Sequence, residues 1–279
     1  MAKIVTVINF KGGVGKTVIS IEIATALARF YGKRTLLVDL DPQASATFYV
    51  MEQRKWKEWK DENGSTYDIF NQQQRSFSIQ RAIARDVVQG KAPVIGFDLL
   101  PSNPDLVDVD LGLAEFIGHN ILRRHFDHIY NEYDYIICDC PPTFNPVTKN
   151  ALWASHAYVV PTVPDFLSTY GISLLQRSVQ KLFAATNPMT AFTGPVLGGV
   201  VLTRFKETNT HRWYRDQVRF DYKGKVFEQV ISDSITVASA ADEHTPISAL
   251  SPKNPASKLQ PEFQSLAREF INRIDHLRP

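Results

Sequence analysis

Runs of apolar residues alternate with helical patterns from the start of the chain. Residues 4–10 form a mainly apolar run rich in β-branched side chains, and a glycine-rich segment follows it. Residues 18–30 have the pattern of a largely buried helix that Gly32 ends, and residues 35–39 that of a second buried strand. This order of strand, loop, helix and strand is a βαβ unit, which predicts parallel strands with helices on both faces.

The same rhythm continues along the chain. Four further apolar runs are predicted strands, at residues 97–101, 135–139, 157–161 and 196–203. Helical patterns separate most of them, at residues 105–131, 145–155 and 168–186. A last amphipathic helix is predicted over residues 261–277, with Phe263, Leu266, Phe270, Ile274 and Leu277 at helical spacing. The predicted fold class is therefore α/β, a mostly parallel twisted sheet flanked by helices on both faces.

Residues 51–95 interrupt this rhythm. They are polar and rich in Gln and Arg, and Trp56 and Trp59 lie at helical i, i+3 spacing within them. We interpret this segment as a helical insertion. Because the chain has no Pro/Gly/Ser-rich linker and no internal repeat, we expect residues 1–279 to form one domain that includes the insertion.

Composition is that of an ordinary globular protein, with 44% hydrophobic and 22% charged residues and a net charge of only +2. Any surface for a nucleic acid or an acidic membrane must therefore be local. The two cysteines, Cys138 and Cys140, lie two apart on a predicted strand, so we expect buried free thiols in a reducing compartment. No signal peptide or spanning helix is recognisable, and we expect a cytoplasmic protein.

The glycine-rich segment has the composition of a phosphate loop. It reads Lys11-Gly-Gly-Val-Gly-Lys-Thr17, and its end matches the usual Gly-x-x-x-x-Gly-Lys-[Ser/Thr] pattern, although Phe10 stands where that pattern has its first glycine. An exposed glycine turn is the alternative, but the position between a buried strand and a helix favours phosphate binding by backbone N–H groups. Lys16 would then reach the β- and γ-phosphates, and the Thr17 hydroxyl would bind Mg²⁺. The predicted nucleotide-binding residues here are Lys11, Gly12, Gly13, Val14, Gly15, Lys16, Thr17 and Val18.

Three carboxylates follow predicted strands. Asp139 ends an apolar strand, where a lone carboxylate is costly unless it meets a cation, so we expect it to hold Mg²⁺ through water. A helix N-cap before Pro141 is the alternative. Asp39 and Asp41 flank the end of strand 35–39 and face the same loop.

The loop, with its extra lysine at the start, resembles the deviant Walker A motif of the ParA/MinD family of P-loop ATPases. Leu37-Val-Asp39-Leu-Asp41-Pro-Gln43 looks like the family's switch I, and Ile137-Cys-Asp139-Cys-Pro-Pro142 like its Walker B and switch II. Weaker similarity, at residues 100–106, at residues 198–204 and in the last helix, extends the resemblance over nearly the whole chain. Asp-x-Asp-Pro-Gln followed by the small residues 44–47 points to ParA-like partition proteins over MinD.

The resemblance implies ATP and Mg²⁺ as cofactors and a catalytic set of Lys11, Lys16 and Asp41. Lys11 would reach across a nucleotide sandwich dimer to the partner's phosphates, in the manner of an arginine finger. Asp41 would orient the attacking water. The implied metal site consists of Thr17, Asp39 and Asp139.

The resemblance also implies which residues contact the base, and the sequence departs from the family's pattern at two positions. Thr203 and Arg204 match the family's base-contacting positions. Phe10 stands where Gln or Gly is frequent, and Ile231-Ser232 stands where an Ile-Pro pair is usual. No helix-turn-helix precedes the phosphate loop, so binding to a specific operator is not expected.

A basic segment supplies the local charge that the whole chain lacks. Residues 204–225 contain seven basic and three acidic side chains, a balance of +4. Arg212, Arg215 and Arg219 lie at i, i+3, i+7 and would share one face of a helix, with Tyr214 and Val218 turned inward. A solvated helix face is the alternative, but the family resemblance favours sequence-independent DNA binding to phosphates. The candidate DNA-binding residues are Arg204, Arg212, Arg215 and Arg219.

These features predict a ParA-like positioning ATPase. An ATP-bound homodimer would bind nucleoid DNA nonspecifically, and a ParB-like or other cargo adaptor would stimulate its weak hydrolysis and so segregate plasmid or chromosomal DNA. Two alternatives are a ParA-like protein that positions a non-DNA cargo and a MinD-like membrane-cycling regulator, which requires a free C-terminal amphipathic helix. A metabolic P-loop enzyme is a third, although no second-substrate motif is visible. Membrane binding is not expected.

Overall fold

One parallel sheet forms the centre of the protein. The computed structural model describes residues 1–71, 77–88, 96–109, 120–184 and 194–277. Within them, six strands pair in parallel in the order β3-β2-β4-β1-β5-β6, which confirms the predicted fold class. The strands are β1 (Lys3–Val7), β2 (Thr35–Asp39), β3 (Asp98–Leu100), β4 (Tyr135–Asp139), β5 (Ala157–Thr162) and β6 (Val196–Leu202).

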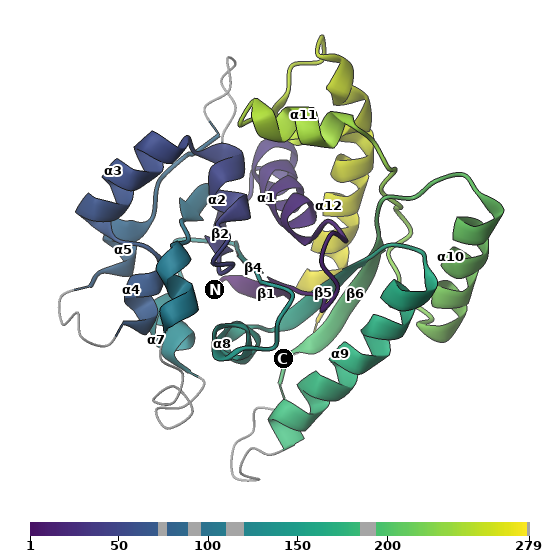
Figure 1. Cartoon of the computed structure of the whole chain (residues 1–279), viewed down its shortest axis with the longest axis horizontal. Coiled ribbons are helices and arrows are strands. Elements are labelled where there is room, and N and C mark those ends of the chain that lie inside the picture. Colours follow the sequence, from purple (N-terminus) through teal and green to yellow (C-terminus); the bar gives the residue numbers. More distant parts are fainter. Residues whose placement is uncertain (72–76, 89–95, 110–119, 185–193, 278–279) are drawn as a thin grey trace.

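Helices cover both faces of the sheet (Figure 1). One layer contains α1 (Lys16–Tyr31), α2 (Ser45–Val50), α11 (Thr236–Asp242), the short 3₁₀ helix η2 (Ile247–Ala249) and α12 (Gln260–Asp275). The other contains α4 (Thr66–Phe70), α5 (Ile79–Ala82), α7 (Ile121–Asp127), α8 (Pro146–Ala154), α9 (Phe166–Ala184) and α10 (Asn209–Asp221). Helix α3 (Gln53–Asn63) packs against α2 and α5, and the 3₁₀ helices η1 (Pro104–Asp108) and η3 (Pro255–Leu259) lie in connections.

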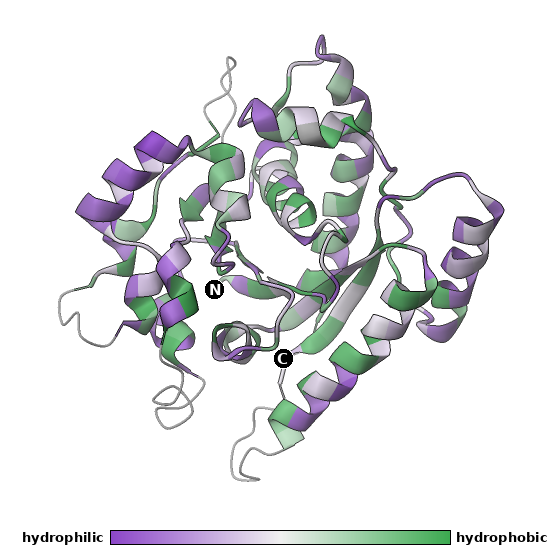
Figure 2. Ribbon diagram, in the orientation of Figure 1, coloured by the Kyte–Doolittle hydropathy of each residue, from purple (hydrophilic) through white to green (hydrophobic). Residues whose placement is uncertain are grey.

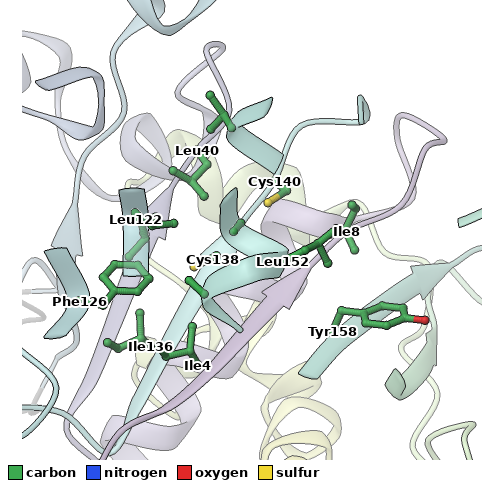
Figure 3. Close-up of a cluster of buried hydrophobic side chains, with 14 of the residues drawn as sticks. Ile4, Ile8, Leu40, Leu122, Phe126, Ile136, Cys138, Cys140, Leu152 and Tyr158 are labelled. Atoms are coloured by element: carbon green, nitrogen blue, oxygen red, sulfur yellow. The ribbon is translucent and has the colours of Figure 1, made fainter. Parts of the chain in front are cut away.

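Both faces of each central strand are buried in apolar surroundings. Ile4, Ile136 and Cys138 point into the cluster that α7 and α8 complete, as Figure 3 shows with Phe126 and Leu152. The intervening residues of the same strands point into the opposite cluster, against α1 and α12. Figure 2 shows the strands as mainly hydrophobic and α3 as mainly hydrophilic. Burial on both faces explains why the strands read as continuous apolar runs rather than as alternating patterns.

The last helix packs on the core, beside α1. Phe263, Leu266, Phe270 and Ile274 of α12 are completely buried, and the Phe270 ring meets the Tyr135 ring edge-on at 5.7 Å between centroids. Its amphipathic pattern is therefore that of a helix that covers a sheet.

The structure shortens one predicted helix. Where a single helix was expected over residues 105–131, the described parts are η1 and α7, followed by turns over residues 128–132; residues 110–119 lie outside the described residues, as do 185 and 186 at the end of the helix predicted over 168–186. Proline at the start of η1 and the Asn103 side chain, which accepts a hydrogen bond from the Asp105 N–H, fix the first turn. In the described residues the expected single helix is therefore interrupted after Asp108 and ends at Asp127.

In its described residues, the segment 51–95 contains three helices, followed by residues 83–88, which are not helical and in which Ala84 forms an antiparallel bridge with Leu99. It contains α3, α4 and α5, while residues 72–76 and 89–95 lie outside the described residues. Trp56 is buried and Trp59 half-buried on the inner side of α3. Helix α4 begins with a capping box, in which Ser65 and Asp68 exchange hydrogen bonds with each other's backbone.

A buried carboxylate ties α1 to the segment that precedes the last helix. Glu22 is completely buried and accepts hydrogen bonds from the Ile247 N–H at 2.7 Å and from the N–H and hydroxyl of Ser248 at 2.9 and 2.6 Å. Burial raises the pKa of Glu22 to about 7, although these three donors oppose the shift. Glu22 therefore titrates well above an exposed glutamate.

We expect Glu22→Gln to remove part of the pH dependence of stability. With its pKa raised from 4.5 to about 7, Glu22 keeps a proton in the folded state that the unfolded chain releases. The wild-type free energy of unfolding should therefore fall, relative to that of the glutamine variant, as pH rises through this window, by up to a few kcal/mol. Urea unfolding of both proteins at the two ends of the window measures the difference, and parallel pH profiles would contradict the titration of Glu22.

Candidate nucleotide site

The glycine loop between β1 and α1 adopts the conformation that only glycine tolerates well. Gly13 has φ +73° and Gly15 has φ +82°, and Gly15 forms the N-cap of α1 without any side-chain cap. The first turn of α1 contains no acidic residue. The positive end of the helix dipole and its free N–H groups therefore remain available for an anion.

Hydrogen bonds to two neighbouring segments of the sheet hold the loop in place. The Asn9 amide donates to the Pro161 carbonyl at 2.8 Å and accepts from the Lys11 N–H at 3.0 Å. The Thr203 hydroxyl donates to the Val14 carbonyl at 2.8 Å. Because these contacts come from β5 and from the end of β6, the sheet itself fixes the shape of the loop before any ligand binds.

Lys16 folds back over the loop. Its ammonium group lies 3.4 Å from the Lys11 carbonyl, and the residue is only 8% exposed. Burial lowers the pKa of Lys16, and the nearby carboxylates of Asp139 and Asp41 oppose that shift. A lysine that is removed from water beside two carboxylates is a ready partner for a polyphosphate.

Asp139 ends β4 with one oxygen engaged and one unengaged. Its Oδ1 accepts a hydrogen bond from the Ser20 hydroxyl at 2.8 Å, whereas its Oδ2 is buried without a hydrogen-bond partner among the described residues. Burial raises the pKa of Asp139 to about 6, against the lowering effect of the Thr17 and Ser20 hydroxyls. A buried carboxylate oxygen beside the Thr17 hydroxyl fits a Mg²⁺ ion or one of its water ligands.

Asp39 is saturated by protein donors. Its Oδ1 accepts from the Asp41 N–H at 3.2 Å, and its Oδ2 from the N–H and hydroxyl of Thr47 at 2.8 and 2.7 Å. Burial first, and the Asp139 charge next, raise the pKa of Asp39 to about 8. These contacts give Asp39 a role in holding the segment that carries Asp41, in addition to the metal role that the sequence suggested.

The Lys11 side chain lies against the start of α9. Its ammonium group donates to Asp165 at 2.8 and 3.1 Å and to the Ser168 hydroxyl at 2.9 Å, at the start of α9. The pair is about one-third exposed on each side. Exposed pairs of this kind contribute about 1 kcal/mol or less, so Lys11 is easily released.

A cleft of about 1020 Å³ brings most of the predicted site residues together. Most of the phosphate loop lines it, together with Asp41, Thr203 and Arg204. Lys11, Val14, Asp39 and Asp139 do not line it: Lys11 faces α9, and the other three are buried behind the surface. The predicted residues that line the cleft are Gly12, Gly13, Gly15, Lys16, Thr17, Val18, Asp41, Thr203 and Arg204.

Ser232, which stands where the family usually has proline, lines the cleft and uses its backbone N–H. Its N–H and hydroxyl donate to the two oxygens of Glu262 on α12, at 2.8 and 2.7 Å. A proline here could not donate from its backbone. Next to it, Asp233 binds Arg204, whose backbone is left-handed at φ +49° and whose guanidinium also donates to the Gly13 carbonyl at 3.2 Å. Arg204 thus joins this side of the cleft to the phosphate loop.

Sequence reasoning missed several polar residues that build the site: Asn9, Ser20, Asp165, Ser168 and Asp233. Ser20 had a local signal, because it lies one turn after Lys16 on the same face of α1. The other four contact partners that lie more than two dozen residues away in the sequence, or contact backbone groups, and they belong to no recognisable motif. Phe10, the departure in the loop, packs edge-on against Phe144 at 5.7 Å between ring centroids.

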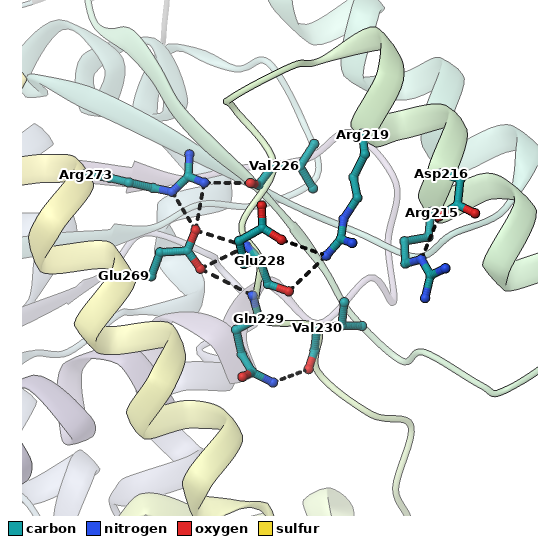
Figure 4. A network of polar contacts seen from close by, with 9 residues as sticks. All are labelled: Arg215, Asp216, Arg219, Val226, Glu228, Gln229, Val230, Glu269 and Arg273. Carbon is teal, nitrogen blue, oxygen red and sulfur yellow. Dashed lines mark hydrogen bonds and ion pairs between the residues drawn. The ribbon is translucent and has the colours of Figure 1, made fainter.

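The predicted basic helix exists, but its arginines carry acidic partners. Val218 is buried and Tyr214 half-buried, as the spacing predicted. The ion pairs are Arg212 with Glu207 at 2.8 Å, Arg215 with Asp216 at 2.8 Å and Arg219 with Glu228 at 3.3 Å. Figure 4 shows Arg219 turned toward Glu228, whose backbone N–H donates to Glu269 of α12. These exposed pairs reduce the free positive charge of the helix but are individually weak.

Comparison with known proteins assigns the chain to a family. Its sequence matches the AAA domain family over residues 2–192. It is 30% identical over 271 residues to the sporulation initiation inhibitor protein Soj of Bacillus subtilis, in a match that covers 96% of this chain and 98% of Soj. It is also 30% identical over 284 residues to the chromosome partitioning protein ParA of Caulobacter vibrioides, with 97% and 94% coverage. The chain belongs to the ParA/Soj family of P-loop ATPases.

A solved structure shares the fold of this ParA/Soj-family chain. A putative plasmid partition protein from Borrelia burgdorferi bound to AMPPNP superposes with a TM-score of 0.75, at 23% identity, over 98% of this chain and 100% of that one. The resemblance inferred from the three motifs is thereby confirmed at the level of family and fold.

We expect Lys16→Ala to abolish ATP binding by this ParA/Soj-family protein. The substitution removes the buried cation over the phosphate loop, and charge-assisted hydrogen bonds contribute about 1.5–3 kcal/mol each, so affinity should fall on the order of 100-fold or more. Titration with a fluorescent ATP analogue measures the loss. Lys57→Ala, at an exposed lysine of α3, is the control, and near-normal affinity in Lys16→Ala would contradict the assignment of the loop.

Proposed function

We propose that this protein is an ATP-dependent partition ATPase whose homodimer binds DNA without sequence preference and releases it on hydrolysis. The observation that carries the proposal is one cleft that combines a preformed phosphate loop, the buried Lys16, the unengaged Oδ2 of Asp139 behind it and Asp41 at its edge. Family membership with Soj and ParA supports the same cycle.

The cleft suits ATP with Mg²⁺. Backbone N–H groups of the loop and Lys16 would bind the β- and γ-phosphates, while Thr17 and Asp139 would hold the ion. Among the described residues, no group of three or more His, Cys, Asp or Glu side chains could bind a metal alone. The ion therefore needs phosphate oxygens and water to complete its shell, which makes its binding depend on the nucleotide. Thr203 and Arg204 border the part of the cleft left for the base.

Asp41 and Lys11 would have different roles in hydrolysis. Asp41 lines the cleft from the segment between β2 and α2, where its carboxylate can orient a water toward the γ-phosphate. Lys11 would leave Asp165 and reach the phosphates of a second copy. A cation that arrives only on assembly makes hydrolysis depend on dimer formation.

The basic helix α10 is the surface proposed for DNA. Phosphates would compete with Glu207, Asp216 and Glu228 for the three arginines, and a dimer would present two such helices. A ParB-like or other cargo adaptor would then stimulate hydrolysis and free the protein from the nucleoid.

The MinD-like alternative receives no support from the last helix. Phe263, Leu266, Phe270 and Ile274 are completely buried, and α12 packs on α1, so these side chains are not available to a lipid surface without unfolding that side of the core. No helix among the described residues combines the length and apolarity needed to span a membrane.

We expect Lys11→Ala to bind ATP and remain monomeric. The Lys11 side chain faces α9 rather than the cleft, so its loss should leave the shape of the cleft intact while it removes the proposed contact to the partner's phosphates. Light scattering with a slowly hydrolysed ATP analogue, beside a nucleotide titration, separates the two steps. Lys57→Ala again serves as the control, and an intact, active Lys11→Ala dimer would refute the role of Lys11.

We expect the triple variant Arg212→Glu, Arg215→Glu, Arg219→Glu to lose DNA binding while it retains ATP binding. For each DNA phosphate that no longer pairs with an arginine, the slope of log affinity against log salt should fall by roughly 0.9. Mobility shifts of random duplex across a salt titration measure this. The matched control, with the same change of charge, is Arg54→Glu, Lys55→Glu, Lys57→Glu on the exposed face of α3, on the other side of the molecule in Figure 1. Equal shifts for both triple variants would place the DNA surface elsewhere.

A further inference from the structure

A cluster of buried polar side chains lies behind Asp41, where β2 and β3 end. It consists of Asp39, Thr47, Thr66 and Ser102, all completely buried. These residues come from four segments: β2, α2, α4 and the turn after β3. A fully satisfied buried polar network of this kind fixes one geometry for the segments that it joins, because any shift leaves a buried donor or acceptor without a partner.

The network holds the backbone of Asp41 on both sides. The Asp41 N–H donates to Asp39 Oδ1 at 3.2 Å, and the Asp41 carbonyl accepts from the Ser102 hydroxyl at 2.6 Å. The Asp41 carboxylate itself accepts only from the Gln43 N–H, at 3.0 Å, among its hydrogen bonds in the described residues. The backbone of Asp41 is thus held in place while its carboxylate faces the cleft.

Ser102 connects Asp41 to the insertion. Its N–H donates to the Thr47 hydroxyl at 2.9 Å, and its carbonyl accepts from the Trp56 indole N–H at 2.9 Å. Trp56 belongs to α3, which lies beside α2 in Figure 1. The insertion makes a second contact through Thr66, whose N–H donates to the Pro101 carbonyl at 2.9 Å and whose hydroxyl donates to the Asp39 carbonyl at 3.1 Å.

We propose that Ser102 is a positioning residue for Asp41, and that Trp56 of the insertion sets the hydrolysis rate by holding Ser102. The proposal rests on the water-orienting role proposed for Asp41. Neither Ser102 nor Trp56 lines the cleft. They act on the placement of the attacking water and not on the affinity for nucleotide, which gives residues 51–95 a function in turnover.

The size of the effect follows from the bonds involved. A neutral hydrogen bond contributes a net free energy of only a small multiple of RT. Because hydrolysis depends on where the attacking water lies, a displaced Asp41 carboxylate would lower the rate further. Loss of the Ser102 hydroxyl should therefore reduce turnover roughly three- to tenfold. Loss of the Trp56 indole N–H, which acts one step further away, should reduce it by a smaller factor.

Phosphate release at saturating ATP and Mg²⁺, with the dissociation constant of a fluorescent ATP analogue and the melting temperature measured on the same samples, tests the proposal. Ser102→Ala should lower turnover and leave the dissociation constant unchanged. Trp56→Phe should show the same split, with a smaller loss. Trp59→Phe is the matched control: it removes an indole N–H from the same helix, but one that donates to the Ala82 carbonyl at 3.1 Å, away from Asp41.

Three results would overturn the inference. Wild-type turnover in Ser102→Ala would show that the hydroxyl does not position Asp41. A parallel loss of nucleotide affinity would show a merely structural role, and equal effects of Trp56→Phe and Trp59→Phe would show that α3 acts only through stability. Asp41→Ala, measured alongside, tests the role of Asp41 itself: if it hydrolyses ATP at the wild-type rate, the proposed catalytic role is wrong, whereas an inactive Asp41→Ala beside an unaffected Ser102→Ala refutes only the role of Ser102.

Discussion

Two buried carboxylates at the end of neighbouring strands impose the main constraint on this structure. Asp39 and Asp139 occupy the same register on β2 and β4, so their carboxyl groups lie side by side at the carboxyl edge of the sheet. Burial disfavours both charges, and the Asp139 charge further raises the pKa of Asp39. Such a pair is tolerable only when hydrogen bonds or a cation compensate it. The protein compensates the two in different ways: Asp39 receives three donors, whereas Asp139 keeps one oxygen for a ligand beside Lys16 and Thr17.

Helix α1 links Asp139 to the segment that precedes α12. Its first turn follows the phosphate loop directly, Ser20 one turn later donates to Asp139, and Glu22 accepts from Ile247 and Ser248. Helix α1 therefore contacts both the carboxyl end of β4 and the segment before α12. These contacts explain why a helix so rich in apolar residues also contains the buried polar residues Ser20 and Glu22.

The sequence predicted the fold class and the position of the glycine loop between a strand and a helix, and for a physical reason. Strands that are buried on both faces have continuous apolar sequences, and the backbone conformation at Gly13 and Gly15 requires glycine. Both features can therefore be recognised within a few residues of sequence. Partners distant in sequence leave no such mark. The pairing of Lys11 with Asp165, the saturation of Asp39 by Thr47 and the acidic partners of the α10 arginines depend on how segments meet in space. The basic face of α10 shows the difference most clearly, since its spacing was right while its free charge was overestimated.

Backbone strain marks the segments around the cleft. Four non-glycine residues of the described chain have positive φ angles, and three of them border this site: Ala44 lies between the lining residues Gln43 and Ser45, while Arg204 and His244 line the cleft themselves. A left-handed non-glycine residue costs of order 1–3 kcal/mol and persists only where the surroundings enforce it. His244 also binds the Phe48 carbonyl of α2 at 2.8 Å, so the strained segments on the two sides of the cleft touch each other. At this cleft the contacts of Arg204 with Gly13 and Asp233, and that of His244 with Phe48, hold two of these left-handed residues in place.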